Sequence, residues 1–280
     1  YTVYDFENYR YHLGPDVQVG NIYPVMYAKT FFDGMKAEGQ ENIINLLRCA
    51  WAGSQKYGAL VWSGDIKSSF PSMKNQVAAG LNMGIAGIPW WTTDIGGFFG
   101  ANVNDPEFHE LLIRWFEYGC FCPVMRLHGY RWPLQPQYGT TGGATCVSGA
   151  PNEVWRYTDQ GCEILSDYLR LRERMLPYIT ELMEEAHEKG TPVMRPLFYD
   201  FPEDKESWNV ETEYMFGPKV LVKPITDADA RETDVYLPGG ASWTNAWTGE
   251  TFEGGQKVHV AAPIEQIPLF TRDGYKLPMK

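Results

Sequence analysis

The chain has 280 residues, and 35 acidic against 24 basic side chains give it a formal net charge of −11 at pH 7. An anionic surface repels phosphate backbones, so the composition disfavours a nucleic-acid partner. Its longest apolar runs are far shorter than the roughly 20 residues that a helix needs to cross a bilayer, so we expect no membrane segment.

The start of the chain and its cysteines give two further expectations. The chain begins at Tyr1 without a methionine or a signal-type apolar stretch, and we interpret it as an excerpt from a longer polypeptide. Its five cysteines are odd in number and lack zinc-site spacing, so reduced thiols, and with them the cytoplasm, are favoured. Aromatic residues make up 15 % of the chain. Aromatic side chains pack cores and also line sugar-binding sites.

The first two-thirds of the chain alternates between helical and strand patterns. Apolar residues recur at helical spacing over 22–38, and short apolar runs over 43–48 and 58–62 are typical of buried strands. The alternation then continues with a helix over 68–81, a strand over 85–91, a helix over 106–118 and a strand over 121–127.

Three polar residues end successive predicted strands at regular intervals. Asp65, Asp94 and His128 are 29 and 34 residues apart, close to the roughly 30 residues of one βαβ unit. Ligands and catalytic groups gather at the carboxyl ends of parallel strands. No glycine-rich dinucleotide or phosphate loop follows any of these strands. The fold class predicted is therefore α/β, with part of a (β/α)8 TIM barrel favoured over an open sheet.

A change in pattern near residue 190 predicts a second domain. Residues 130–151 have no periodicity and indicate a long functional loop, and 159–189 form a helix pair with a break at Pro177 and a stop at Gly190. Short alternating runs over 214–216, 220–222, 233–237, 257–260 and 267–270 then predict strands of a small antiparallel domain. We expect one domain over 1–190 and a second, sandwich-like one over 191–280.

Side chains suited to carbohydrate chemistry converge at the predicted strand ends. They are Arg48, Trp62, Asp65, Asp94, Phe98, Arg126 and His128. Two carboxylates in different environments are what glycoside hydrolysis requires, because one protonates the departing oxygen while the other attacks or orders water. The histidines show no metal spacing, so we predict no metal site and no cofactor.

Each of these residues also has a structural alternative. Ser63 and Asp65 are both placed to cap the helix that begins near Ser68, and His128 alone would more often be a buried core histidine. Trp62 and Phe98 have the alternative of an ordinary core position, but the common location of these residues at one end of the predicted barrel favours a site.

Several motifs, in one order along the chain, resemble the family 31 glycoside hydrolases. They are Asn21-Ile22-Tyr23-Pro24, Arg48-Cys49-Ala50-Trp51-Ala52-Gly53-Ser54-Gln55-Lys56-Tyr57, Trp62-Ser63-Gly64-Asp65, Gly87-Ile88-Pro89-Trp90-Trp91-Thr92-Thr93-Asp94-Ile95-Gly96-Gly97-Phe98 and Arg126-Leu127-His128-Gly129. The resemblance covers essentially the whole chain. It implies a retaining α-glucosidase or α-xylosidase, with strands five to eight of the barrel followed by that family's β domain.

The resemblance also implies roles for individual residues. Asp65 corresponds to the general acid/base, and the subsite for the cleaved sugar is lined by Arg48, Trp62, Asp94, Phe98 and His128. The nucleophile of the family stands on the fourth strand in a motif that we do not find. Asp5 matches it only faintly, so we expect the nucleophile upstream of this chain.

These observations predict hydrolysis of terminal α-xylosyl or α-glucosyl bonds. The motif over 90–98 resembles the α-xylosidase branch of the family most. The partners expected are an oligosaccharide or aryl glycoside, with no nucleic acid and no membrane, and an oligomer stays open. We expect this stretch alone to be inactive. The alternative is a non-catalytic carbohydrate-binding or scaffold fragment.

Overall fold

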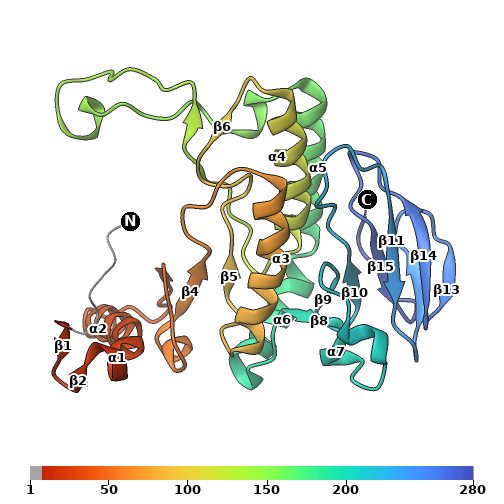
Figure 1. The fold of residues 1–280 in the computed structure, drawn as a ribbon, viewed down its shortest axis with the longest axis horizontal. Coiled ribbons are helices and arrows are strands. Elements are labelled where there is room, and N and C mark those ends of the chain that lie inside the picture. The colour runs from red at the N-terminus through yellow and green to blue at the C-terminus, as the bar shows by residue number, and fades with distance from the viewer. Residues whose placement is uncertain (1–7, 280) are drawn as a thin grey trace.

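The computed structural model describes residues 8–279, which form an α/β region followed by an antiparallel β region (Figure 1). The first elements are short: β1 (Arg10–Tyr11), β2 (Gly14–Pro15), α1 (Asp16–Val19) and η2 (Gly20–Ile22). Asp5, the faint nucleophile candidate, lies outside the described residues.

Three parallel strands organise the α/β region. Their order in the sheet is β3 (Asn45–Leu47), β4 (Ala59–Trp62) and β5 (Trp91–Thr92). The segments that precede and connect them are α2 (Tyr23–Ala37), η3 (Ser54–Tyr57) and α3 (Phe70–Ile85). The expected helices and the first two expected strands are therefore confirmed, with boundaries shifted by a few residues.

Local chemistry explains where the connecting helices begin. The Ser69 hydroxyl accepts a hydrogen bond from a backbone N–H of the first turn of α3, and Pro71 occupies that turn. α4 (Pro106–Cys120) begins in the same way, with the Asp105 carboxylate as its cap. Since Ser69 caps α3, the interpretation of Ser63 or Asp65 as that cap is wrong.

The strands predicted over 85–91 and 121–127 differ from expectation. The first is reduced to β5, because α3 continues through Ile85. The second is not a strand: it runs beside β5, where the Val124 N–H donates to the Trp91 carbonyl at 3.2 Å. A continuous ladder does not form here because 121–123 still turn away from α4 and Pro123 has no N–H to donate.

Residues 130–151, expected to be a loop, project as an arm from the body of the molecule (Figure 1). At the base of the arm, β7 (Arg131–Trp132) pairs in parallel with β6 (Ala101–Asn102). Farther out, a single bridge joins Gln135 to Ser148. Two short 3-10 turns belong to this part of the chain, η4 (Gly142–Thr145) and η5 (Val154–Arg156).

The predicted helix pair is confirmed as α5 (Asp159–Arg174) and α6 (Leu176–Lys189). Pro177 lies in the first turn of α6, where its missing N–H costs nothing. Gly190 ends α6 with a left-handed φ of 72°, a conformation that glycine adopts without strain.

The remainder of the chain is mostly antiparallel sheet. Six strands pair in the order β13 (Thr251–Glu253), β12 (Ser242–Asn245), β15 (Leu269–Arg272), β10 (Val220–Val222), β9 (Tyr214–Phe216) and β8 (Met194–Pro196). A separate pair consists of β11 (Glu232–Leu237) and β14 (Gln256–Ala261), and two short helical turns are α7 (Leu197–Asp200) and η6 (Lys205–Trp208). The predicted antiparallel character is confirmed; β8, β12 and β13 were not predicted.

One hydrophobic core continues from the α/β region into the β region. Trp115 on α4, Leu165 on α5 and Tyr214 on β9 are all buried in it. Arg114, also fully buried, donates hydrogen bonds to four backbone carbonyls of the β region, those of Ala230, Ala262, Pro263 and Gln266. The two regions are therefore joined by packing and by hydrogen bonds.

Candidate active site

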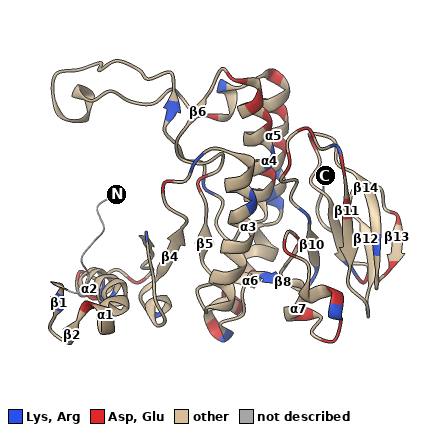
Figure 2. Ribbon diagram, in the orientation of Figure 1, with Lys and Arg blue, Asp and Glu red and all other residues tan. Residues whose placement is uncertain are grey.

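Charged residues follow the strands of the parallel sheet and are absent within them. β3, β4 and β5 contain no charged residue (Figure 2). Arg48 directly follows β3, Asp65 follows β4 by three residues, and Asp94 follows β5 by two. Because the three strands are parallel neighbours, these side chains project from one edge of the sheet.

Arg48 and Asp65 form an exposed ion pair at this edge. The Arg48 guanidinium donates to the Asp65 carboxylate at 3.0 Å, and the two side chains are 64 % and 43 % exposed. The guanidinium carbon of Arg48 lies 5.4 Å from the ring centroid of Trp62. The Asp65 carboxylate is thus accessible to a ligand while an aromatic face supports its partner.

Asp94 has the opposite environment. Its side chain is fully buried, and one oxygen accepts a hydrogen bond from Arg126, whose guanidinium lies 6.0 Å from the Trp62 ring. Its other oxygen has no hydrogen-bond partner among residues 8–279. Burial raises the pKa of Asp94; Arg126 and His128 act against this, and the charge of Asp65 adds to it.

Aromatic rings lie at the same edge of the sheet. The Phe98 ring lies 5.5 Å from the His128 ring and 6.5 Å from the Tyr130 ring, centroid to centroid. His128 is exposed and Phe98 and Trp62 are half-buried. The interpretation of His128 as a buried core histidine is therefore wrong.

The structure thus brings the predicted side chains together in linked pairs: Arg48 with Asp65, Asp94 with Arg126, and Phe98 with His128, with Trp62 between the two arginines. A pyranose has an apolar C–H face and a polar rim. Aromatic rings, guanidinium donors and carboxylate acceptors are the groups that match both.

Sequence reasoning missed Arg131, which lies behind this edge. Its guanidinium is fully buried and donates to backbone carbonyls of the loops that carry Asp94 and His128. An arginine that begins a two-residue strand has no pattern that distinguishes it from a surface arginine, so only the tertiary contacts identify it.

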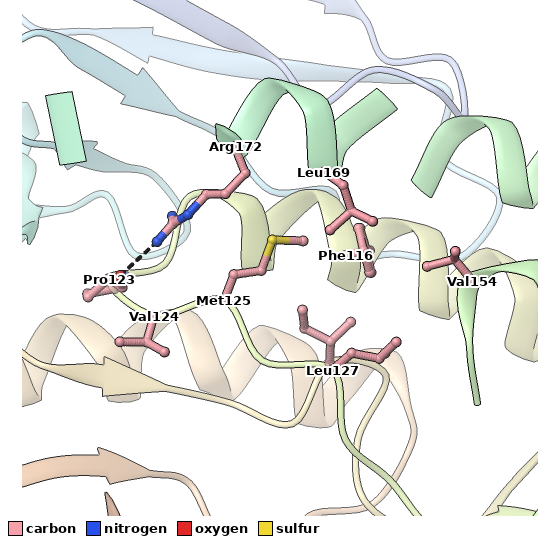
Figure 3. A pocket seen from close by; sticks show the side chains of 9 residues that line it. Phe116, Pro123, Val124, Met125, Leu127, Val154, Leu169 and Arg172 are labelled. Carbon is pink, nitrogen blue, oxygen red and sulfur yellow. Dashed lines mark hydrogen bonds between the residues drawn. The ribbon is translucent and has the colours of Figure 1, made fainter. Parts of the chain in front are cut away.

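One apolar cavity of the α/β region is lined by neither Asp65 nor Asp94. It has a volume of about 440 Å³ and lies between α4, α5 and the 123–127 segment, with Phe116, Met125, Leu127 and Leu169 in its wall (Figure 3). Its lining is apolar except for Arg172, whose guanidinium donates to the Pro123 carbonyl at 2.8 Å.

Within 8–279, no three His, Cys, Asp or Glu side chains come together in an arrangement that could hold a metal ion. Over the same residues, no helix combines the length and the apolar character needed to cross a membrane.

Comparison with known proteins places both regions in one family. Residues 3–182 match the model of the glycosyl hydrolases family 31 TIM-barrel domain, and residues 190–277 match that of the family 31 C-terminal domain. An alpha-xylosidase of Saccharolobus solfataricus is 37 % identical over 95 % of this chain, which covers 34 % of that protein. Alpha-xylosidase A of Aspergillus niger is 34 % identical over 94 % of the chain and 38 % of its own length. The chain spans about a third of the length of these relatives.

Solved structures agree with this placement. An alpha-xylosidase from a soil metagenome, complexed with xylose, superimposes with a TM-score of 0.93 at 56 % identity, covering 99 % of this chain and 41 % of that one. A dextranase of Flavobacterium johnsoniae, complexed with glucose, gives a TM-score of 0.84 at 30 % identity, covering 97 % of this chain and 32 % of that one. The sequence motifs, the fold and both family matches agree that this chain belongs to glycosyl hydrolase family 31.

Proposed function

We propose that the protein hydrolyses terminal α-glycosidic bonds, with α-xylosyl preferred over α-glucosyl units, by a retaining double displacement. The observation that carries this proposal is the placement of an exposed carboxylate, Asp65, at the same carboxyl edge of adjacent parallel strands as the aromatic rings and the buried Asp94 carboxylate that suit a sugar. The preference for xylose is supported by the alpha-xylosidase relatives, among them the one whose structure holds xylose.

Asp65 is the proposed general acid/base. As an acid it protonates the glycosidic oxygen when the sugar–oxygen bond breaks, and as a base it then removes a proton from the attacking water. Its exposure and its place on the loop after β4 support this role, because the group must meet both leaving group and water. Arg48 holds the carboxylate through the 3.0 Å hydrogen bond.

The remaining predicted residues form the proposed subsite for the cleaved sugar. Trp62 and Phe98 supply apolar faces for the C–H side of the ring, and Arg48 and His128 supply hydrogen-bond donors for its hydroxyls. Asp94, held by Arg126, supplies a carboxylate acceptor. Arg126 joins this set because the structure pairs it with Asp94.

The nucleophile is proposed to lie in a longer polypeptide that contains this chain. A retaining enzyme needs two carboxyl groups about 5–5.5 Å apart. Of that pair we assign only Asp65 here, since the resemblance places Asp94 in the sugar subsite. β3, β4 and β5 then correspond to strands five to seven of a barrel, and the 121–127 segment beside β5 takes the place of the eighth. The boundary between the two domains falls at residue 190, where Gly190 ends α6.

The test uses the full-length protein with aryl α-xyloside and aryl α-glucoside. We expect turnover on both, with a higher kcat/KM on the xyloside, and proton NMR of the first-formed product should show the α-anomer. A β-anomer would refute the retaining mechanism. Binding of xylose without turnover of either substrate would favour the non-catalytic alternative.

A further inference from the structure

The guanidinium of Arg131 has every donor occupied in the interior. The side chain is fully buried at the start of β7, and arginine carries five N–H donors in a planar fork. The five acceptors lie at 2.7–3.4 Å: the Asn152 side chain, the Ser68 hydroxyl, and the carbonyls of Gly97, Ile95 and His128.

Four of these acceptors belong to the three segments that carry the candidate active site. Ile95 and Gly97 follow Asp94 in the loop after β5, and Ser68 follows Asp65 in the segment after β4. The fourth is the backbone of His128 itself. One side chain therefore connects the supports of Asp65, Asp94 and His128.

Backbone hydrogen bonds also connect these segments directly to one another. The Phe98 N–H donates to the Ile66 carbonyl at 2.7 Å, and the Tyr130 N–H donates to the Phe98 carbonyl at 2.6 Å. A Cβ at Gly129 would lie 2.3 Å from the guanidinium carbon of Arg131. The guanidinium is thus closely packed between the three segments, and all of its N–H donors have hydrogen-bond acceptors.

We propose that Arg131 is a positioning residue of the active site, which fixes these three segments relative to one another and so sets the geometry of Asp65, Asp94 and His128. The inference rests on the proposed function and deepens it. Arg131 is buried behind the edge and acts through the backbone. Lysine cannot replace it, because a lysine ammonium has three donors at a single point and would leave buried carbonyls unpaired.

The chain offers a matched control. Arg114 is equally buried, and its guanidinium also donates to several backbone carbonyls, but these belong to the β region, far along the chain from the three segments. Arg114 differs in that it also donates to the buried Glu117 carboxylate. Arg114→Lys and Arg131→Lys both remove buried guanidinium–carbonyl hydrogen bonds, and only the second variant touches the proposed site.

The experiment measures kinetics and amide hydrogen exchange of both variants in the full-length protein. We expect Arg131→Lys to lower kcat/KM of the folded enzyme by roughly 10²-fold, the scale for active-site groups misplaced by about 1 Å. Exchange should accelerate in 66–69, 95–99 and 128–131. Arg114→Lys should lower the melting temperature but keep both the kinetics and the exchange of these segments. Wild-type kinetics and exchange in folded Arg131→Lys would overturn the proposal.

Two provisions keep this test decisive. If Arg131→Lys does not fold, Asn152→Ala removes one acceptor instead. Faster exchange in the same segments with a several-fold lower kcat/KM then supports the proposal, and unchanged values overturn it. If the wild-type protein hydrolyses no glycoside, the proposed function fails, and the exchange measurement alone decides whether Arg131 fixes the three segments.

Discussion

Asp65 and Asp94 both follow adjacent parallel strands, yet tertiary packing gives them different surroundings. The Asp65 side chain is 43 % exposed, whereas that of Asp94 is fully buried and its pKa is raised by burial. Different environments are what allow two carboxyl groups to take different roles. At the residue scale, the exposed Asp65 is the one placed to exchange protons with a leaving group and with water.

Replacing Asp65 tests this role. In the full-length enzyme, Asp65→Ala should slow hydrolysis of substrates with poor leaving groups by about 10²–10⁴-fold, because only these need a proton at departure. Activated aryl glycosides should be affected far less in their first step. The measurement is kcat/KM across a series of leaving groups. Equal losses along the series would leave Asp65 as a positioning residue.

At the scale of elements, the edge depends on segments that approach one another too closely for ordinary side chains. Gly97 has a left-handed φ of 74°, and a Cβ there would lie 2.6 Å from the Cα of Ser68. Both the backbone conformation and the contact therefore require glycine. This close approach brings the segment after β4 against the loop after β5.

Gly97→Ala should therefore destabilise the protein by about 2 kcal/mol or more, combining left-handed strain with a backbone clash. Gly34 is the control, because it is exposed, lies between the ends of α2, and a Cβ there would meet nothing within 4 Å. Gly34→Ala should stabilise the helix by about 0.5–1 kcal/mol. Denaturant unfolding of both variants measures the free energies. Similar values for the two would contradict the required close approach.

At the scale of the whole molecule, a buried arginine–glutamate pair lies where the two regions meet. Arg114 donates to Glu117 at 3.2 Å, and both side chains are fully buried. Next to them, the Tyr168 hydroxyl donates to the Glu265 carbonyl and accepts from the Ile267 N–H. Burial raises the pKa of Glu117 from 4.5 to about 8, although Arg114 acts against this shift.

This raised pKa makes stability depend on pH. Between pH 4.5 and about 8 the folded state keeps a proton on Glu117 that the unfolded state has lost, so stability falls as pH rises through this window. The slope is at most about 1.4 kcal/mol per pH unit. In Glu117→Gln this contribution disappears, so the difference in unfolding free energy between the two proteins should change from pH 5 to 8. Parallel curves would show that Glu117 does not titrate there.

The unpaired side of the outer strand β3 leads to a prediction for residues 1–280 made alone. Among the described strands β3 has only one neighbour, and Ile44 and Leu46 beside and within it are 59 % and 42 % exposed. Unpaired apolar edges favour association. We expect the isolated chain to self-associate in sedimentation and to be silent on aryl α-xyloside. Turnover abolished by both Asp65→Ala and Asp5→Ala would instead place the nucleophile within the chain.

The sequence by itself determined the main helices, the parallel region, the antiparallel region that follows it, and the family. Local signals carry this information: helical spacing over 68–81, the break at Pro177, the stop at Gly190, and long motifs that follow the strands. The spacing of Asp65, Asp94 and His128 predicts that they lie at one edge, because parallel strands align their carboxyl ends.

Only the tertiary structure decided which of these groups are buried and what each one contacts. Whether His128 is exposed, whether Asp65 caps α3, and how Arg131 connects three segments all depend on residues distant in the chain. The prediction of a strand over 121–127 was wrong for the same reason. An apolar run becomes a strand only where a neighbouring strand offers a continuous ladder of hydrogen bonds. Burial and hydrogen-bond partners are properties of the packed chain, and no local pattern encodes them.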